Sequence, residues 1–172
     1  SGSKSYTSEA DGSTVTISDW KKEGWGTLTY DEGFALSSNI AVANIVESVI
    51  TKEELKSCYA KYGFGKATGF SLKREDKGSI DYRYQIEAAT AGYGQGITTT
   101  PIQHLQALTA IANDGVMLRP YVVDKITLSN SKKSIYTGKR MVVGTVASSD
   151  TISKMKELMK SVINGDETNS TG

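Results

Sequence analysis

The sequence has only one cysteine, no large excess of either charge and no long apolar run, and each of the missing features is typical of a particular class of protein. Cys58 is its only cysteine, so no internal disulfide can form, which fits cytosolic proteins and also secreted bacterial proteins that use few cysteines. Neither charge dominates, because Lys and Arg total 20 against 19 for Asp and Glu. Without a basic stripe bearing interleaved aromatic residues, we expect no nucleic-acid partner. No apolar run approaches the length of a membrane helix, and no signal-peptide pattern is present.

Metal and nucleotide sites lack support as well. His104 is the only histidine, and no Cys, Asp or Glu accompanies it at ligand spacing. Two glycine-rich stretches, 63–69 and 92–96, have neither the dinucleotide-binding spacing nor the Gly-Lys-Ser/Thr of a phosphate loop. We therefore predict no metal and no cofactor, and we interpret these glycines as sites of tight turning and close packing.

The patterns that are present predict one α+β domain over residues 1–172. An apolar share of 38% in 172 residues suffices for a core. Capping patterns at Thr29, Thr51 and Thr100 predict three helix starts, and Asp150 predicts a fourth. Strand patterns occur at 6–17, around an Asp-Gly turn, and at 121–143, and residues 64–84 are expected to form a surface loop. The residues expected on buried helix faces include Cys58, Leu105, Leu108, Ile111 and Ala112.

Ser37-Ser38-Asn39 lies where one helical pattern stops and an almost wholly apolar one begins. In one interpretation these small polar residues only cap the second helix. In the other, the Ser37 hydroxyl relays a proton, and the Asn39 amide donates to a substrate carbonyl and accepts from a charged neighbour. The two interpretations are compatible, because one residue can cap while its neighbour faces a cleft.

Several stretches in consistent order resemble one family. Asp19-Trp20 and residues 25–39 resemble the middle of the transpeptidase domain of class B penicillin-binding proteins, the enzymes that cross-link bacterial cell walls. Residues 92–97 with 99–103 resemble that family's Gly-Gln-Gly segment and the helix behind it, and residues 113–120 resemble the stretch that follows. The resemblance implies a fragment of the serine β-lactamase/D,D-transpeptidase-like fold, mainly its helical part with some flanking strands.

The family's Ser-x-Asn motif corresponds to Ser37 and Asn39, which the resemblance makes the catalytic residues of this chain. It places Trp20, Ser38 and Gln95 at the substrate. The family also needs a nucleophilic Ser-x-x-Lys upstream and a Lys-Ser/Thr-Gly downstream, and the latter is absent. The Ser-x-x-Lys patterns at 1–4, 129–132 and 153–156 do not fit the role of the nucleophile motif, so we expect the fragment alone to be inactive.

The resemblance also implies partners and a location. The expected partners are a peptidoglycan stem peptide and β-lactam antibiotics, at the extracytoplasmic face of the bacterial cytoplasmic membrane, with any anchor in a segment absent from this chain. A core that lacks its sheet is expected to expose apolar surface and to self-associate. Two alternatives remain: a non-catalytic helical binding or structural module, and a serine hydrolase that uses His104.

Overall fold

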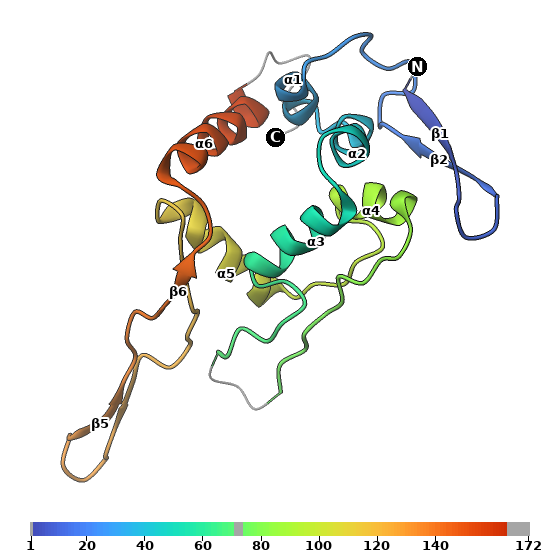
Figure 1. The fold of residues 1–172 in the computed structure, drawn as a ribbon. Helices are drawn as coiled ribbons and strands as arrows, with labels where there is room; N and C mark the ends of the chain where they lie inside the picture. Colours follow the sequence, from blue (N-terminus) through green and yellow to red (C-terminus); the bar gives the residue numbers. More distant parts are fainter. Residues whose placement is uncertain (1, 71–73, 165–172) are drawn as a thin grey trace. The chain divides into compact units, whose positions relative to one another are not determined.

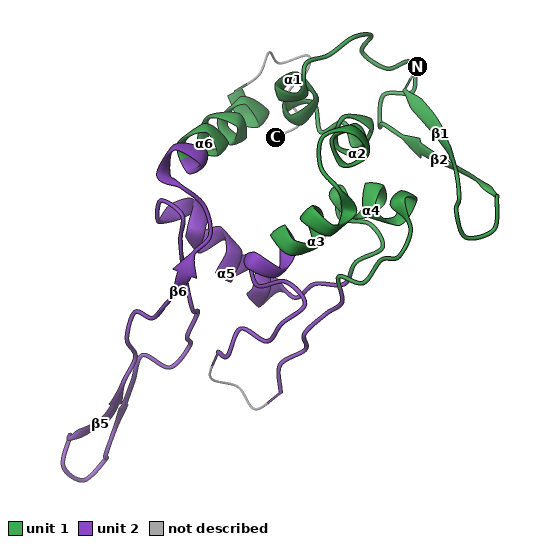
Figure 2. Cartoon of the chain, in the orientation of Figure 1, with its two compact units in different colours: residues 1–58, 80–97, 153–172 green, residues 59–79, 98–152 purple. Residues whose placement is uncertain are grey.

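The computed structural model describes residues 2–70 and 74–164. The chain forms two compact units: unit 1 comprises residues 1–58, 80–97 and 153–172, and unit 2 comprises residues 59–79 and 98–152 (Figure 2). That residues 1–172 belong to one domain stays a prediction. The Ser-x-x-Lys pattern that begins at Ser1, and the end of the chain at 165–172, lie outside the described residues.

The described residues contain both helices and strands, which confirms the α+β class (Figure 1). None of these helices is long and apolar enough to cross a membrane. In chain order the elements are β1 (Ser3–Thr7), β2 (Thr14–Ser18), α1 (Tyr30–Ala35), α2 (Asn39–Ser48), α3 (Lys52–Lys61), α4 (Gln85–Gly92), α5 (Pro101–Ala112), β3 (Val116–Leu118), β4 (Lys125–Thr127), β5 (Ser134–Thr137), β6 (Val142–Thr145) and α6 (Ser149–Asn164).

Unit 1 packs an antiparallel hairpin of β1 and β2 beside α2, with α4 against the same helix. Its core consists of Ile17 from β2, Ala43 from α2, and Ile86 and Ala89 from α4. The predicted hairpin is confirmed, but its turn is longer than two residues. Strand β1 ends at Thr7 and β2 begins at Thr14, and the backbone N–H of Ser8 donates to the backbone oxygen of Ser13 at 2.8 Å. This unit carries the whole Ser-x-Asn segment.

Unit 2 packs α5 against the antiparallel pair β3–β6, around Ala110, Met117 and Val146. Strands β4 and β5 form a second, exposed antiparallel pair. The described parts of the expected 64–84 loop contain one isolated bridge and no named strand. Fully buried Gln103 holds this loop, since its Nε2 donates to the backbone oxygens of Lys66 and Lys77, each at 2.8 Å.

The predicted buried face of α5 is wrong. Leu105 and Leu108 are 53% and 52% exposed. The buried stripe is instead Gln103, Gln106, Ala107 and Ala110, which has the same i, i+3, i+4, i+7 spacing. Hydropathy alone selected the wrong stripe, because the side that packs is determined by small alanines and by the polar contacts of Gln103.

Two smaller predictions also fail. Cys58 is exposed, although it follows the buried Leu55 by three residues on α3, so the buried contact of this helix does not extend to it. Helix α6 begins at Ser149, one residue before the expected cap Asp150, and the Ser148 hydroxyl accepts the backbone N–H of Thr151 at 3.2 Å.

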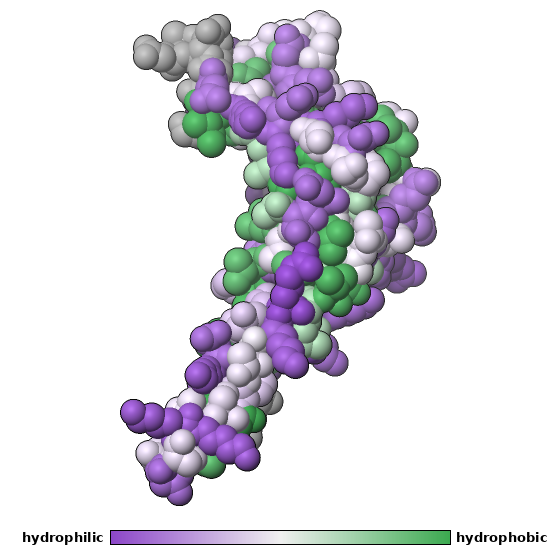
Figure 3. Space-filling model, turned by 90° about the vertical axis from the view of Figure 1, so that its left-hand side faces the viewer, coloured by the Kyte–Doolittle hydropathy of each residue, from purple (hydrophilic) through white to green (hydrophobic). Residues whose placement is uncertain are grey.

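Apolar surface is exposed in both units, as predicted. Figure 3 shows apolar patches between hydrophilic side chains on one face of the molecule. The exposed large apolar residues include Val122, Ile135, Val142, Val143 and Ile163. Self-association through this surface stays a prediction.

Candidate active site

Ser37 occupies a tight junction between α1 and α2. Helix α1 starts with the predicted capping box, in which the Thr29 hydroxyl accepts the N–H of Glu32 and the Glu32 carboxylate accepts the N–H of Thr29. These bonds, the backbone one foremost, lower the pKa of the Glu32 carboxyl below its ordinary 4.5. The short helix ends at Ala35 with Leu36 as its C-cap, and Ser37 then takes a left-handed backbone with φ of 51°.

The turn at Ser37 is a Schellman motif. The N–H of Ser37 bonds to the oxygen of Phe34 at 3.0 Å, and the N–H of Ser38 bonds to the oxygen of Gly33 at 2.9 Å. Glycine usually fills the left-handed position of this motif, because a side chain there costs about 1 kcal/mol. Here the position holds an exposed serine. A residue other than glycine in this sparsely populated backbone region is a reason to look for a role for its side chain.

Close packing of α1 on α2 keeps the junction compact. A Cβ atom added to Gly33 would lie 2.5 Å from Cβ of Ala41, so the two helices touch where Gly33 has no side chain. Ser38 is the N-cap of α2, and its Oγ accepts the N–H of Ala41 at 3.0 Å. The capping interpretation is therefore correct for Ser38, the residue that caps α2.

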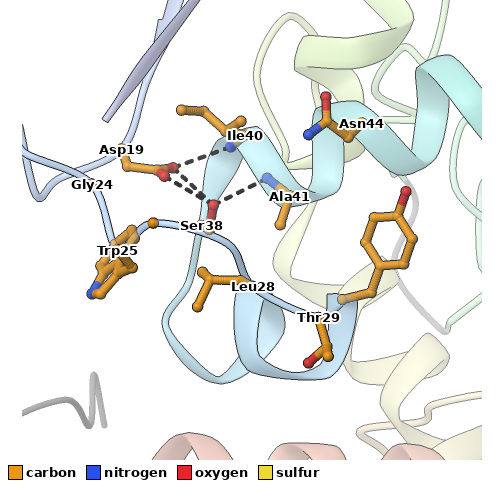
Figure 4. Close-up of a pocket in the computed structure, with 11 residues that line it drawn as sticks. Asp19, Gly24, Trp25, Leu28, Thr29, Ser38, Ile40, Ala41 and Asn44 are labelled. Atoms are coloured by element: carbon orange, nitrogen blue, oxygen red, sulfur yellow. Dashed lines mark hydrogen bonds between the residues drawn. The ribbon is translucent and has the colours of Figure 1, made fainter. Parts of the chain in front are cut away.

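Two consecutive residues hold this junction, Ser18 at the end of β2 and Asp19 directly after it. Ser18 accepts a hydrogen bond of 2.9 Å from Nδ2 of Asn39, through its backbone oxygen. The Asp19 carboxylate accepts from the Ser38 hydroxyl at 2.9 and 3.1 Å and from the N–H of Ile40 at 3.1 Å. Figure 4 shows the Asp19 carboxylate facing both groups from the opposite segment. These bonds fix the backbone on the C-terminal side of Ser37.

Two cavities flank the junction. The smaller, about 140 Å³, lies on the Asp19 side and is lined by Trp25, Leu28 and Asn44 among others (Figure 4). The larger, about 510 Å³, has Ser37, Ser38 and Asn39 in its wall. The rest of its wall is mostly apolar and comes from Phe34, Val42, Tyr93, Met159, Val162 and Ile163. Ser37 and Asn39 thus share one accessible cavity within unit 1.

Tyr93 is the other polar group in this wall, after the Ser-x-Asn segment. Burial raises the pKa of its phenol above the ordinary 10.0. The phenol O–H is a hydrogen-bond donor.

The other predicted site residues lie outside the lining of the larger cavity. Trp20 is 61% exposed and contacts Trp25 edge to face at 5.4 Å between ring centroids. Gln95 is exposed in the turn after α4, where its N–H bonds to the oxygen of Thr90 at 3.0 Å. Their assignment to the substrate stays a prediction.

His104 and Cys58 are not part of this site. His104 belongs to unit 2, where its Nε2 lies 2.8 Å from Oγ1 of Thr99 and its ring contacts Phe64. No group of three His, Cys, Asp or Glu among residues 2–70 and 74–164 could hold a metal.

Sequence reasoning missed Asp19 and the Schellman turn. No local pattern links Asp19 to Ser38, which lies 19 residues away in the sequence. A possible signal for the turn was the polar Ser37-Ser38 pair directly after a capped six-residue helix, where a chain must reverse.

Comparison with known proteins agrees with this geometry. The family model of the penicillin-binding protein transpeptidase domain matches residues 3–172. Stage V sporulation protein D of Bacillus subtilis is 31% identical over 162 residues, which is 90% of this chain and 24% of that protein. The peptidoglycan D,D-transpeptidase FtsI of Buchnera aphidicola is 33% identical over 119 residues, 67% of this chain and 20% of that protein.

A solved structure agrees as well. Penicillin-binding protein 2X from Streptococcus thermophilus superposes with a TM-score of 0.77 at 27% identity, covering 93% of this chain and 24% of that one. The chain spans about a quarter of the length of these proteins or less. Residues 3–172 thus make this chain a member of the penicillin-binding protein transpeptidase domain family.

Proposed function

We propose that this chain is the Ser-x-Asn portion of a peptidoglycan D,D-transpeptidase. The substrate class is a stem peptide that ends in D-alanyl-D-alanine. A serine oxygen attacks the penultimate carbonyl, the terminal D-alanine leaves, and the acyl-serine then passes to an amine of a neighbouring strand. The observation that carries the proposal is that Ser37 and Asn39 lie in the wall of one cavity, on a turn that hydrogen bonds from Ser18 and Asp19 hold in place.

Ser37 and Asn39 take the two roles that this chemistry requires. The Ser37 hydroxyl can both donate and accept, so it can pass a proton to the departing amine. The Asn39 amide carries two N–H donors and one oxygen acceptor. Its bond to Ser18 occupies one donor and orients the amide, which leaves groups to hold the substrate carbonyl or a lysine ammonium.

The nucleophile is proposed to lie outside these 172 residues. The sequence contains four Ser-x-x-Lys patterns, at 1–4, 18–21, 129–132 and 153–156. The first ends at Lys4 in β1, whose ammonium pairs with Glu47 of α2 at 2.5 Å. The second begins at Ser18, the last residue of β2, and so does not lie on a helix. Residues 129–132 lie in the β4–β5 turn. Ser153 and Lys156 do lie on a helix, α6, but they follow the Ser-x-Asn segment in the chain, whereas the family's nucleophile precedes it.

The partners and the location follow from the same proposal. β-Lactams mimic the D-alanyl-D-alanine end and would acylate the same nucleophile, as the family description "penicillin binding" suggests. The whole protein would act at the outer face of the bacterial cytoplasmic membrane, where its wall substrate is found.

Covalent labelling with a fluorescent penicillin tests this function. The 172-residue chain should take up no label, because an unactivated serine hydroxyl is a weak nucleophile. The full-length protein should be labelled, and Ser37→Ala or Asn39→Ala should slow its acylation by about 100-fold, the scale of a lost proton relay. His104→Ala should have no effect, in contrast to the serine-hydrolase alternative.

Three results would contradict the proposal. They are label on any serine of the 172-residue chain, an unlabelled full-length protein, and acylation at an unchanged rate in Ser37→Ala. The second result would favour the non-catalytic module, in which the Ser37 turn serves only to join α1 to α2.

A further inference from the structure

A buried carboxylate bonds directly to the Ser-x-Asn segment. Asp19 is 8% exposed, and both of its carboxylate oxygens accept hydrogen bonds from residues 38–40. Its own N–H bonds to the oxygen of Gly2 at 2.8 Å, which fixes the residue from the β1 side. Burying an ionised group is costly unless hydrogen bonds compensate it, so this placement calls for an explanation.

Asp19 acts on α2 as a cap supplied by a distant segment. The N–H of Ile40 points to Oδ1 of Asp19, and the N–H of Ala41 points to the Ser38 hydroxyl. The Ser38 hydroxyl therefore accepts the N–H of Ala41 and donates its own hydrogen to the Asp19 carboxylate (Figure 4). A negative charge at a helix N-terminus is also favourable, since the first N–H groups carry partial positive charge.

The residues on either side of Asp19 in the sequence, Ser18 and Trp20, also form hydrogen bonds with residues that flank Ser37. Trp20 donates its indole N–H to the oxygen of Leu36 at 3.1 Å. Ser18 accepts from Asn39. Residues 18, 19 and 20 therefore bond to residues 36, 38, 39 and 40, and Ser37 is the residue that these bonds bracket.

We propose that Asp19 is a positioning residue of the acylation reaction, which sets the orientation of Ser37 and Asn39 through the Ser38 hydroxyl and the first N–H of α2. This inference rests on the proposed function, and it assigns Asp19 a role beyond helix capping. Asp19 does not touch the larger cavity that holds Ser37 and Asn39, so its effect on substrate is indirect. Small errors in the position of a reacting group can lower a rate by about 100-fold.

The first experiment measures penicillin acylation of the full-length protein, resolving the acylation rate constant from the dissociation constant of the non-covalent complex. Asp19→Ala should lower the rate constant by about 10- to 100-fold at a temperature well below its own melting point. Asp19→Asn keeps an acceptor for Ile40 and should recover a large part of that loss. Asp11→Ala is the matched control, since Asp11 also accepts a backbone N–H, that of Ser13 at 3.0 Å, but in the hairpin turn.

A purely structural Asp19 would give a different result. Asp19→Ala would then lower the melting temperature while every folded molecule kept the wild-type rate constant. There would be no loss of rate for Asp19→Asn to recover. That pattern overturns the proposal. An unchanged rate and an unchanged melting temperature would overturn it as well.

The second experiment is independent of enzymatic activity. Hydrogen exchange of the full-length protein, read by mass spectrometry on peptides that cover residues 38–42, should be at least 10-fold faster in Asp19→Ala and unchanged in Asp11→Ala. Unchanged exchange in Asp19→Ala overturns the positioning role. If the wild type takes up no penicillin but exchange rises as expected, the proposed function fails while the contact of Asp19 with the turn stands.

Discussion

The indole Nε1 of Trp20 donates a 3.1 Å hydrogen bond to the backbone oxygen of Leu36, one residue before Ser37. Trp20 is otherwise 61% exposed, so this bond rather than burial accounts for its contribution to the turn. Trp20→Phe keeps an aromatic ring against Trp25 but removes the donor. We expect the free energy of unfolding to fall by about 1 kcal/mol, the net value of one hydrogen bond, in urea titration.

Trp25→Phe is the comparison for that variant. It changes the other ring of the same pair and removes an indole N–H that has no acceptor among the described residues. A larger loss in Trp25→Phe than in Trp20→Phe would show that ring packing, not the bond to Leu36, determines the stability of this loop.

Gly33 and Ala41 leave no space for an added methyl group between α1 and α2. Gly33→Ala would place two Cβ atoms 2.5 Å apart, and the helices must separate to accept it. Overpacking costs about 1–3 kcal/mol, which exceeds the gain of up to about 1 kcal/mol from alanine's helix propensity. We therefore expect a lower melting temperature, measured by circular dichroism.

A second substitution can restore the space. Gly33→Ala combined with Ala41→Gly exchanges the two side chains across the contact and should melt higher than Gly33→Ala alone. If the double variant is no more stable than the single one, steric conflict at this contact is not the cause.

Gln103 and Gln106 form a matched pair on the buried stripe of α5. Gln103 uses its amide fully, donating to Lys66 and Lys77 and accepting the N–H of Thr100 at 2.9 Å. Gln103→Leu leaves these groups unpaired at about 1–3 kcal/mol each, so a loss of about 3 kcal/mol or more is expected. Gln106 is 4% exposed, and its Oε1 has no hydrogen-bond partner within the part of the chain that the structure describes.

Gln106→Leu should therefore cost less than about 1 kcal/mol, since it removes a buried acceptor that is already unpaired. Chemical denaturation of both variants under one set of conditions gives the comparison. Equal losses would mean that side-chain volume, not hydrogen bonding, is what α5 requires at these positions.

Three capping glutamates predict a loss of stability in acid. Backbone N–H groups of Thr29, Thr51 and Tyr84 bond to Glu32, Glu54 and Glu87 and lower the pKa of each carboxyl below its ordinary 4.5. Since the folded pKa is the lower one, this stability is fully present above about pH 4.5 and is lost as the pH falls through the folded pKa.

Replacing all three glutamates by glutamine should flatten the dependence of the melting temperature on pH below 4.5. The control is Glu53→Gln, which removes a carboxylate from the same first turn of α3 as Glu54 but from a residue outside the capping box. An equally steep acid limb in the triple variant would assign the acid sensitivity to other groups.

The local features of this fold could be predicted because their causes lie within four residues. The capping boxes of Thr29 with Glu32 and Thr100 with Gln103 are formed as the sequence patterns indicate. Periodicity also located the apolar helix after Ser38. It identified the Ser37–Asn39 junction, and the structure places both residues in the wall of one cavity.

The long-range features could not be predicted, because periodicity does not say which side of a helix meets a neighbour. Leu105 and Leu108 are exposed although they are large apolar residues of α5, since the packed side is set by the loop that Gln103 holds, 26 and 37 residues away. Asp19 escaped notice for the same reason: its partner Ser38 is distant in sequence, and a lone aspartate is a common surface residue.

The left-handed backbone at Ser37 has a consequence for protein engineering. Glycine or asparagine adopts a φ near 51° with less strain than serine does, so a selection for heat resistance would favour either residue at position 37. Neither carries a hydroxyl. A library chosen by thermal tolerance alone would therefore discard the proposed proton relay while yielding a more robust fold.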